Sequence, residues 1–192
     1  DEADAFTLQD ERLLATLASQ AAVAFENARL YQTIQQERER FLELFENSPV
    51  ATWLEDFSAV ITWMDELRAQ GITKLREYLE GDPDAYKTGM RLIRILDVNQ
   101  AAVVMNGAQD KDELIDRVHD RMADNTPSQI MVNELELIWK GYTSFGFEMS
   151  SHKLDGSLMT GIMRIYIPTS NNKPDYARVI ITSIDITDRV SI

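Results

Sequence analysis

Few side chains in this sequence could perform chemistry. The 192 residues include no cysteine and only two histidines, His119 and His152, which excludes thiolate nucleophiles, disulfides and cysteine metal sites. No glycine-rich phosphate loop is present. The acidic run from Asp110 to Glu113 lacks the glycine and the alternating ligands of a calcium loop, so we interpret it as the start of a helix. Most other carboxylates fall on predicted helix faces, as solvated charge does. The sequence therefore predicts no enzymatic activity.

The composition excludes further classes of function. The formal charge of −13 arises from 32 acidic and 19 basic residues, which opposes binding to nucleic acid and to anionic membranes. No apolar run reaches the length of about 18 residues that a membrane-spanning helix needs. The acidic first residues do not resemble a signal peptide, and the absence of cysteine fits a reducing cytoplasm. We expect a cytoplasmic piece of a longer protein.

The elements that must position any site begin with one long helix. The first 48 residues contain neither glycine nor proline, and residues 7–47 form one continuous helical pattern. Thr7 and Asp10 give a start signal, and Pro49 ends the pattern. Such a helix would be roughly 60 Å long at about 1.5 Å per residue. This length favours a connector or a dimerisation helix.

A heptad pattern on this helix predicts a homodimer. Its apolar and small residues alternate at spacings of three and four, as in a two-stranded coiled coil, and a shifted pattern through Leu13, Leu17 and Ala24 fits nearly as well. The alternative is an amphipathic helix that lies on its own domain. The expected dimer interface comprises Leu14, Leu17, Ala21, Ala24, Ala28 and Tyr31.

The rest of the chain predicts an α+β fold. Short strands are expected at 50–55 and 91–97, with helices at 56–71, 72–79, 84–89, 99–107, 110–118 and 127–140. The period then changes from helical to alternating, which predicts three antiparallel strands at 142–154, 158–168 and 176–186. Asp155-Gly156 indicates a tight hairpin, and residues 170–173 a longer, looser turn.

Three segments in order resemble a PAS domain, the sensory module of many bacterial signalling proteins. They read ELFENSPVATWLEDFSAV (43–60), LDVNQAAVVMNGAQDKDEL (96–114) and SIDITDRV (183–190). The first is similar to the S-box type common in sensor histidine kinases of two-component systems and in diguanylate cyclases. The resemblance covers residues 41–190 and implies a five-stranded antiparallel sheet with helices on one face.

Residues 1–40 resemble a different family. The segment FTLQDERLLATLASQAAVAFENARLY (6–31) looks like the last helix of a GAF domain, whose body is missing. Residues 56–90 depart from the PAS pattern as a helical insertion where a tight connection is usual. We expect this insertion to pack on the sheet edge or on the entering helix.

The PAS resemblance implies a space for a small molecule between the sheet and its helices. No charged residue is clearly placed among the inward positions, so the ligand class stays open, with a small apolar ligand as the simplest expectation. A filled core is the alternative. A flavin–cysteine adduct is excluded, and for haem only the two histidines remain, which we interpret as solvated or capping residues. The expected lining is Trp53, Met105, Met122, Trp139, Phe145, Phe147, Met163 and Ile181.

The closing motif implies a route out of the domain. Asp185 and Thr187 match its Asp-Ile-Thr and would relay a signal to an output domain such as a histidine kinase or a diguanylate cyclase. Asp185 is expected to accept backbone hydrogen bonds or to pair with a basic group on the entering helix, and the motif could equally cap the next helix. The sequence thus predicts a sensory signal-transduction module. A ligand-free dimerisation and relay module is the alternative, and an enzyme acting on a small apolar substrate is the third.

Overall fold

The chain divides into two compact units. The computed structural model describes residues 7–122 and 128–190, without the side chains of His119, Arg121, Met122, Arg189 and Val190. One unit extends to Leu44 and the other begins at Phe45. Among the described residues, no helix is long and apolar enough to cross a membrane.

Helix α1 spans Leu8–Glu46, 39 residues, and confirms the single helix predicted from the sequence. Its start signal forms as expected, since the Thr7 hydroxyl donates to Asp10 Oδ2 at 2.7 Å and accepts from the Asp10 amide at 3.3 Å. The Thr7 amide, which donates to Asp10 Oδ2 at 2.9 Å, and then the Thr7 hydroxyl lower the pKa of Asp10. All six residues of the expected dimer seam are exposed, Tyr31 by 65%. The dimer itself stays a prediction.

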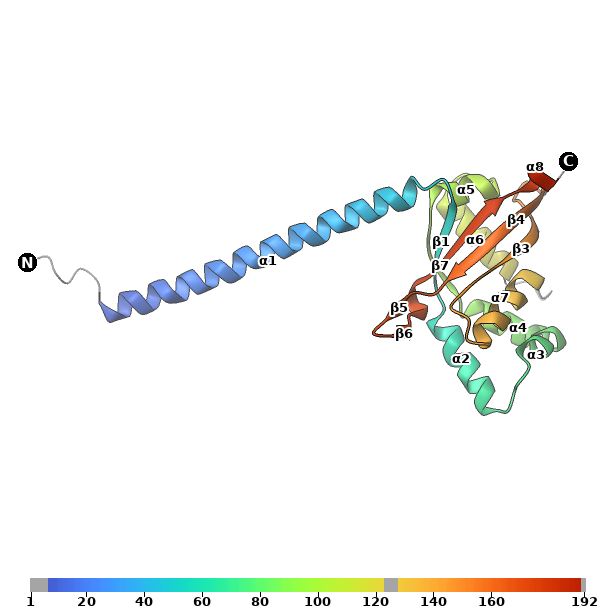
Figure 1. Cartoon of the computed structure of the whole chain (residues 1–192), viewed down its shortest axis with the longest axis horizontal. Helices are drawn as coiled ribbons and strands as arrows, with labels where there is room; N and C mark the ends of the chain where they lie inside the picture. Colours follow the sequence, from blue (N-terminus) through green and yellow to red (C-terminus); the bar gives the residue numbers. More distant parts are fainter. Residues whose placement is uncertain (1–6, 123–127, 191–192) are drawn as a thin grey trace, which may run out of the picture. The chain divides into compact units, whose positions relative to one another are not determined.

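The second unit is built on a five-stranded antiparallel sheet with the order β2-β1-β7-β4-β3. Its helices lie on one face of this sheet (Figure 1). The α+β fold that the sequence predicted is therefore confirmed. The strands are β1 Ala51–Asp56, β2 Arg94–Val98, β3 Ser144–His152, β4 Leu158–Tyr166 and β7 Val179–Asp185.

In the part of the chain that the structure describes, seven short helices follow α1, and local signals fix several of their ends. The Asn99 side chain accepts a hydrogen bond from the Ala102 amide at 3.0 Å, and Gly107 takes the left-handed conformation at φ 72° that ends α5. The described helices are α2 Ser58–Ala69, α3 Leu75–Gly81, α4 Pro83–Arg91, α5 Gln100–Asn106, α6 Lys111–Met122, α7 Gln129–Trp139 and α8 Thr187–Val190.

The connection before β7 differs from the prediction. Strands β5 Thr169–Ser170 and β6 Lys173–Pro174 pair around two asparagines, Asn171 and Asn172, with φ of 51° and 60°. Asparagine tolerates this conformation, so the turn is tight, and the predicted looser turn is wrong. Residues Tyr176–Arg178 form a 3₁₀ turn, η1, so β7 starts later than predicted.

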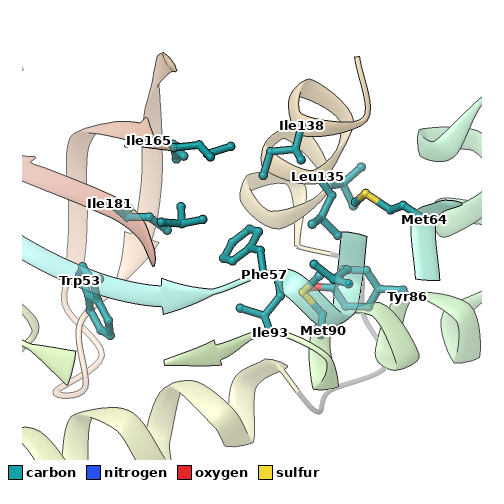
Figure 2. Packing of buried hydrophobic residues seen from close by; sticks show 14 of the residues in the cluster. Trp53, Phe57, Met64, Tyr86, Met90, Ile93, Leu135, Ile138, Ile165 and Ile181 are labelled. Carbon is teal, nitrogen blue, oxygen red and sulfur yellow. The ribbon is translucent and has the colours of Figure 1, made fainter. Parts of the chain in front are cut away.

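The inserted helices extend the helical layer. Helix α3 packs against α7 and α4 packs against α6, so other helices of the layer support these two helices where the sequence predicted the sheet edge; support by the entering helix stays a prediction. The reason is apolar burial: Tyr86 and Met90 of α4 are almost fully buried among residues from the other elements. Figure 2 shows these side chains with Leu135 and Ile138 of α7 and with Ile165 and Ile181 of the sheet. One core thus joins the insertion, α7 and the sheet.

A single buried asparagine joins the start of this unit to the sheet. Asn99 is fully buried, and its Oδ1 accepts from the Thr52 amide at 2.9 Å. Its Nδ2 donates to the carbonyls of Phe45 at 3.0 Å and Val50 at 2.9 Å. The carboxamide therefore ties the residues before β1, the first residues of β1 and the start of α5 together.

Candidate functional site

A cavity of about 330 Å³ lies between the inward face of the sheet and the helices α4 to α7. Its apolar and aromatic lining comes from Trp53, Tyr86, Met105, Val118, Ile130, Met131, Met149, Met159, Met163 and Ile181. Its polar lining comes from Glu55, Asn106, Ser128, Glu134, Ser151 and Ser183. The volume lies at the small end of the range of about 300–1,000 Å³ typical of ligand sites.

Two buried carboxyl groups face this cavity from different layers. Glu55 lies on β1 with 6% of its surface exposed, and Glu134 lies on α7 with 1% exposed. Burial raises the pKa of Glu55 to about 8. Burial, and then the nearby charge of Glu55, raise the pKa of Glu134 well above its usual range. Among the described residues, none makes a hydrogen bond with Glu134 Oε1.

The alternation of β1 places Glu55 on the inward face. Ala51, Trp53 and Glu55 are buried while the residues between them are half-buried. Trp53 pairs with Ile181 of β7, and Ala51 pairs with Ser183. Strands β1 and β7 are therefore neighbours in the wall of the cavity.

The helical period of α7 places Glu134 on its buried face. Met131 lies one turn before Glu134 and Ile138 one turn after it, and both pack in the apolar layer. Glu134 occupies a position where an apolar side chain would ordinarily lie. Its charge, when present, has no solvent to stabilise it.

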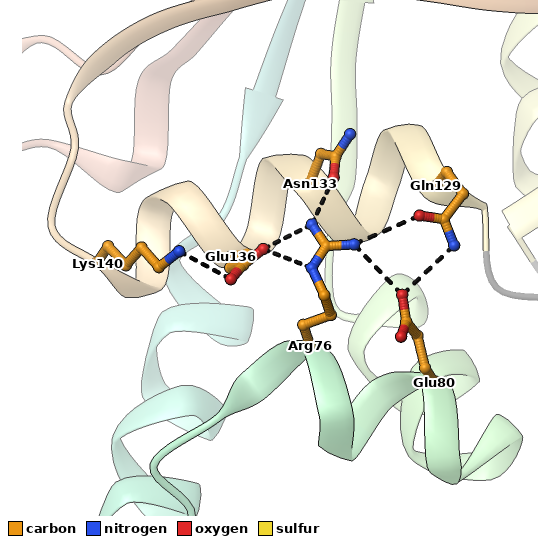
Figure 3. Close-up of polar contacts among 6 residues, drawn as sticks. All are labelled: Arg76, Glu80, Gln129, Asn133, Glu136 and Lys140. Carbon is orange, nitrogen blue, oxygen red and sulfur yellow. Dashed lines mark hydrogen bonds and ion pairs between the residues drawn. The ribbon is translucent and has the colours of Figure 1, made fainter.

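The other side of α7 is fixed by an arginine from the insertion, as Figure 3 shows. Arg76 of α3 donates through Nε to Glu136 Oε2 at 2.6 Å and through Nη2 to Asn133 Oδ1 at 2.5 Å. Longer contacts of 3.3 Å reach Glu80 and Gln129. This Arg76 network holds α7 against α3, and it thereby holds the backbone that carries Glu134.

Four of the eight predicted lining residues do line the cavity: Trp53, Met105, Met163 and Ile181. Three others, Trp139, Phe145 and Phe147, pack against the hydrophobic core but do not line it. The ring of Trp139 instead lies 4.0 Å from the Arg68 guanidinium carbon. The side chain of Met122 is outside the described residues. Whether any of these residues binds a ligand stays a prediction.

The expectation that no charged residue clearly points inward is wrong, because Glu55 and Glu134 both do. Sequence reasoning missed them because it assigned carboxylates to the surface. The signal was present, since Glu55 continues the alternation of Trp53 and Glu134 continues the apolar face of α7.

The histidines do not lie at this site as far as the structure describes them. His152 is exposed on β3, and the side chain of His119 is outside the described residues. Among the described residues, no group of three or more histidine, cysteine, aspartate or glutamate side chains could hold a metal ion.

Asp185 and Thr187 form a polar cluster where β7 ends. Asp185 Oδ1 accepts from the Thr187 amide at 2.9 Å and from its hydroxyl at 2.5 Å, and Oδ2 pairs with Lys153 at 2.9 Å. The Thr187 hydroxyl and then Lys153 lower the pKa of Asp185 to about 2. Thr187 Oγ1 also accepts from the Thr160 amide at 3.0 Å. The basic partner thus comes from the β3–β4 hairpin, which corrects the expected pairing with the entering helix, and the motif does cap the start of α8.

The chemistry open to this site follows from its parts. A cavity with an apolar lining and two buried carboxyls can hold protons or accept hydrogen bonds from a bound molecule. The neutral hydroxyl and amide groups around it can orient such a molecule.

Comparison with known proteins adds similarities of fold. No protein-family model and no curated protein matches the chain. Solved structures similar to it include the PAS domain of an HTR-like protein from Haloarcula marismortui, which is 15% identical and has a TM-score of 0.46, with 83% of this chain and 99% of that chain covered. A PAS domain from Colwellia psychrerythraea is 13% identical over 81% and 99%, with a TM-score of 0.46. A domain of a sensory box sensor histidine kinase/response regulator from Geobacter sulfurreducens is 13% identical over 79% and 96%, with a TM-score of 0.44.

Proposed function

We propose that the second unit is a PAS-type sensory module that binds a small molecule and passes the change on within a longer signalling protein. One observation carries this proposal: β1 and β7, two neighbouring strands among those that line the cavity, are also the strands at which the chain enters and leaves the sheet. A ligand that displaces Trp53 or Ile181 therefore acts directly on both connections. The S-box type is supported by the sequence resemblance of residues 43–60 alone.

The proposed route into the sheet runs through Asn99. Because this side chain bonds to the carbonyl of Phe45 and to the amide of Thr52, a shift of β1 is passed to the residues at the end of α1. Lys111 adds a second tie, since it pairs with Glu46 and, at 2.8 Å, with Asp97. Allostery of this kind needs two states of the sheet with different affinity for the ligand.

The proposed route out runs through Asp185 and Thr187. Thr187 bonds to Thr160 on β4, and Asp185 bonds to Thr187 and Lys153, so a shift of β7 changes the start of α8. The output domain that we propose, a histidine kinase or a diguanylate cyclase, rests on the sequence resemblance. We propose a binding role without catalysis, and a cytoplasmic location stays a prediction.

Native mass spectrometry combined with hydrogen exchange tests this function. We expect the full chain, purified without denaturation, to carry a small molecule that is absent from its denatured mass. Removal of that molecule should speed amide exchange in β1, in β7 and around Asn99. An empty protein with slow exchange throughout the sheet would contradict sensing and favour a ligand-free relay module.

We also propose that α1 pairs with a second copy of itself and that residues 1–40 are the exit helix of a GAF domain. The support is the exposed apolar surface of α1, where Leu14 and Leu17 are 55% and 52% exposed. Light scattering should show a dimer that the double substitution Leu14→Asp and Leu17→Asp converts to a monomer. The matched control is Ser19→Asp, outside the seam, which should leave the dimer intact. A wild-type monomer, or a dimer that survives the double substitution, would contradict the interface.

A further inference from the structure

We propose that the cavity binds an organic cation, with an ammonium or amidinium group held between Glu55 and Glu134 and an apolar body lying on the methionine side chains. This inference rests on the proposed ligand-binding function and names the chemical class of the ligand.

The position of Glu134 carries the first step. Its side chain is 1% exposed, it lines the cavity, and among the described residues none bonds to its Oε1. A buried carboxyl oxygen without a donor costs about 1–3 kcal/mol, and more when charged. Buried polar atoms in proteins nearly always have a hydrogen-bond partner, which removes this cost. We therefore infer that the donor for Glu134 Oε1 comes from a bound ligand.

The charge of the cavity carries the second step. Of the described residues that line it, the ionisable ones are Glu55, Glu134 and Tyr86, and none is basic. An anionic ligand would meet two carboxyls with no compensating positive charge. A neutral ligand would gain no charge-assisted hydrogen bond from the pair. A monocation can bond to both carboxyls and balances one carboxylate charge while the second carboxyl keeps its proton, which makes a cation the favoured class.

The apolar lining carries the third step. Five of the eight methionines of the chain line the cavity, together with the indole ring of Trp53. Thioethers are polarisable and adapt to irregular shapes, and an indole face attracts a cation. These surfaces suit the apolar body of an amine better than a hydrated ion. A bare divalent metal ion is disfavoured, because hard cations take six or more oxygen ligands and no group of three metal-binding side chains exists among the described residues.

Binding of the cation is coupled to protons. Without a bound cation, burial raises the pKa of Glu55 to about 8 and that of Glu134 well above its usual range, so burial favours the protonated form of both carboxyls. The ammonium favours the carboxylate form. The O–H bond of a carboxyl then breaks, its electron pair stays on the oxygen and its proton passes to the buffer. Net release of protons on binding follows.

Calorimetric titration of the full chain tests the inference with pairs of probes of equal shape. The cationic probes are butylamine, benzylamine and tryptamine, each compared with the alcohol in which a hydroxyl replaces its amino group, and benzoate serves as the anion. At pH 7 we expect at least one amine to bind at least tenfold more tightly than its alcohol, and benzoate not to bind. Repeating the titration in buffers of different ionisation enthalpy should show that protons are released.

Variants test whether amine binding depends on the two cavity carboxyls or on the overall negative charge of the protein. Glu134→Gln and Glu55→Gln should each weaken amine binding at least tenfold and should reduce proton release. The matched control is Glu148→Gln, which removes an exposed carboxylate from β3 and should leave binding unchanged. Circular dichroism of each variant confirms folding. Failure of every amine to bind, equal binding of amine and alcohol, or unchanged binding by both cavity variants overturns the inference.

The same experiment distinguishes failure of the inference from failure of the proposed function. If amines bind but change no hydrogen exchange in β1, in β7 or around Asn99, the cation site stands and the sensory function falls. If the molecule found by native mass spectrometry is neutral or anionic and its removal changes that exchange, the sensory function stands and the cation site falls.

Discussion

Two glutamates on α7, Glu134 and Glu136, lie two residues apart in opposite surroundings. Glu136 faces α3, where Lys140 and then Arg76 lower its pKa. Glu134 faces the cavity, where burial and the Glu55 charge raise its pKa. One helix thus has a side whose charge is fully paired and a side whose carboxyl has an oxygen without a donor. The difference teaches that the paired side of α7 holds the helix in position, while the other side carries the carboxyl that we propose as a binding group.

The largest expected effect is on the pH dependence of stability. The folded protein holds the proton of Glu55 up to a pKa of about 8, whereas the unfolded chain loses it near the ordinary value of 4.5. The unfolded state therefore binds fewer protons in this window, and stability falls as pH rises, by about 1.4 kcal/mol per pH unit for each proton. Urea unfolding of the double variant with Glu55→Gln and Glu134→Gln should remove this fall, to which the Glu55 proton alone contributes about 3 kcal/mol between pH 5 and pH 8.

The control for this prediction is Glu136→Gln on the same helix. Because the pKa of Glu136 is lowered, its contribution is present above the ordinary glutamate value and is lost only in acid. The fall between pH 5 and pH 8 should therefore persist in Glu136→Gln. A double cavity variant with an unchanged pH profile would contradict the view that the pair is buried and unpaired.

The second effect is expected at Arg76. Arg76→Ala removes bonds to Glu136 and Asn133 from a side chain that is 30% exposed, and we expect a loss of about 2 kcal/mol in the free energy of unfolding. Arg76→Lys keeps the charge without the planar fork and should recover part of this loss. The measurement is urea unfolding at pH 7. An Arg76→Ala variant as stable as the wild type would show that α7 is held by apolar packing alone.

A smaller effect is expected at Asp185, a paired carboxylate at the end of β7. Its pKa of about 2 lies below the ordinary value of 3.8, so the stability that it contributes is present above pH 4 and is lost as pH falls toward 2. Because the group is partly exposed, we expect Asp185→Asn to lower stability at pH 7 by about 1 kcal/mol. The acid limb of the unfolding curve should flatten in the variant. If it stays equally steep, the contacts with Thr187 and Lys153 do not hold this end of the strand.

The smallest effect is expected at Lys140. It pairs with Glu136 at 2.8 Å and is the first cause of the lowered pKa, yet its side chain is 54% exposed. Solvent screens such a pair, so Lys140→Met should change stability by about 0.3–0.5 kcal/mol. Thermal unfolding of Lys140→Met beside Arg76→Ala ranks the two partners of Glu136. If Lys140→Met lost more stability than Arg76→Ala, the more exposed partner of Glu136 would be the stronger one, and burial would not rank the two ion pairs.

Local signals predicted much of the fold. The Thr7–Asp10 start of α1, the left-handed Gly107 after α5 and the alternation of the last three strands all depend on residues close in sequence, and all formed. The support of α7 by Arg76 did not follow, because Arg76 and Glu136 are 60 residues apart and the pairing exists only after the insertion folds back. The cavity depends on the same long-range packing. The alternation of β1 and the period of α7 are compatible with inward positions for Glu55 and Glu134, but burial of a carboxylate costs free energy, so sequence reasoning favours the surface for such residues.

The buried carboxamide of Asn99 has a mechanical consequence. Its four hydrogen bonds, all between 2.9 and 3.0 Å, reach Thr52, Ala102, Phe45 and Val50. Such bonds weaken steeply with bending, so these segments move together as one rigid joint or the joint breaks. Aspartate at this position would keep the acceptor and lose both donors, and it would set a negative charge against two carbonyl oxygens. We therefore expect a displacement of β1 to move Phe45 with it as long as these bonds hold.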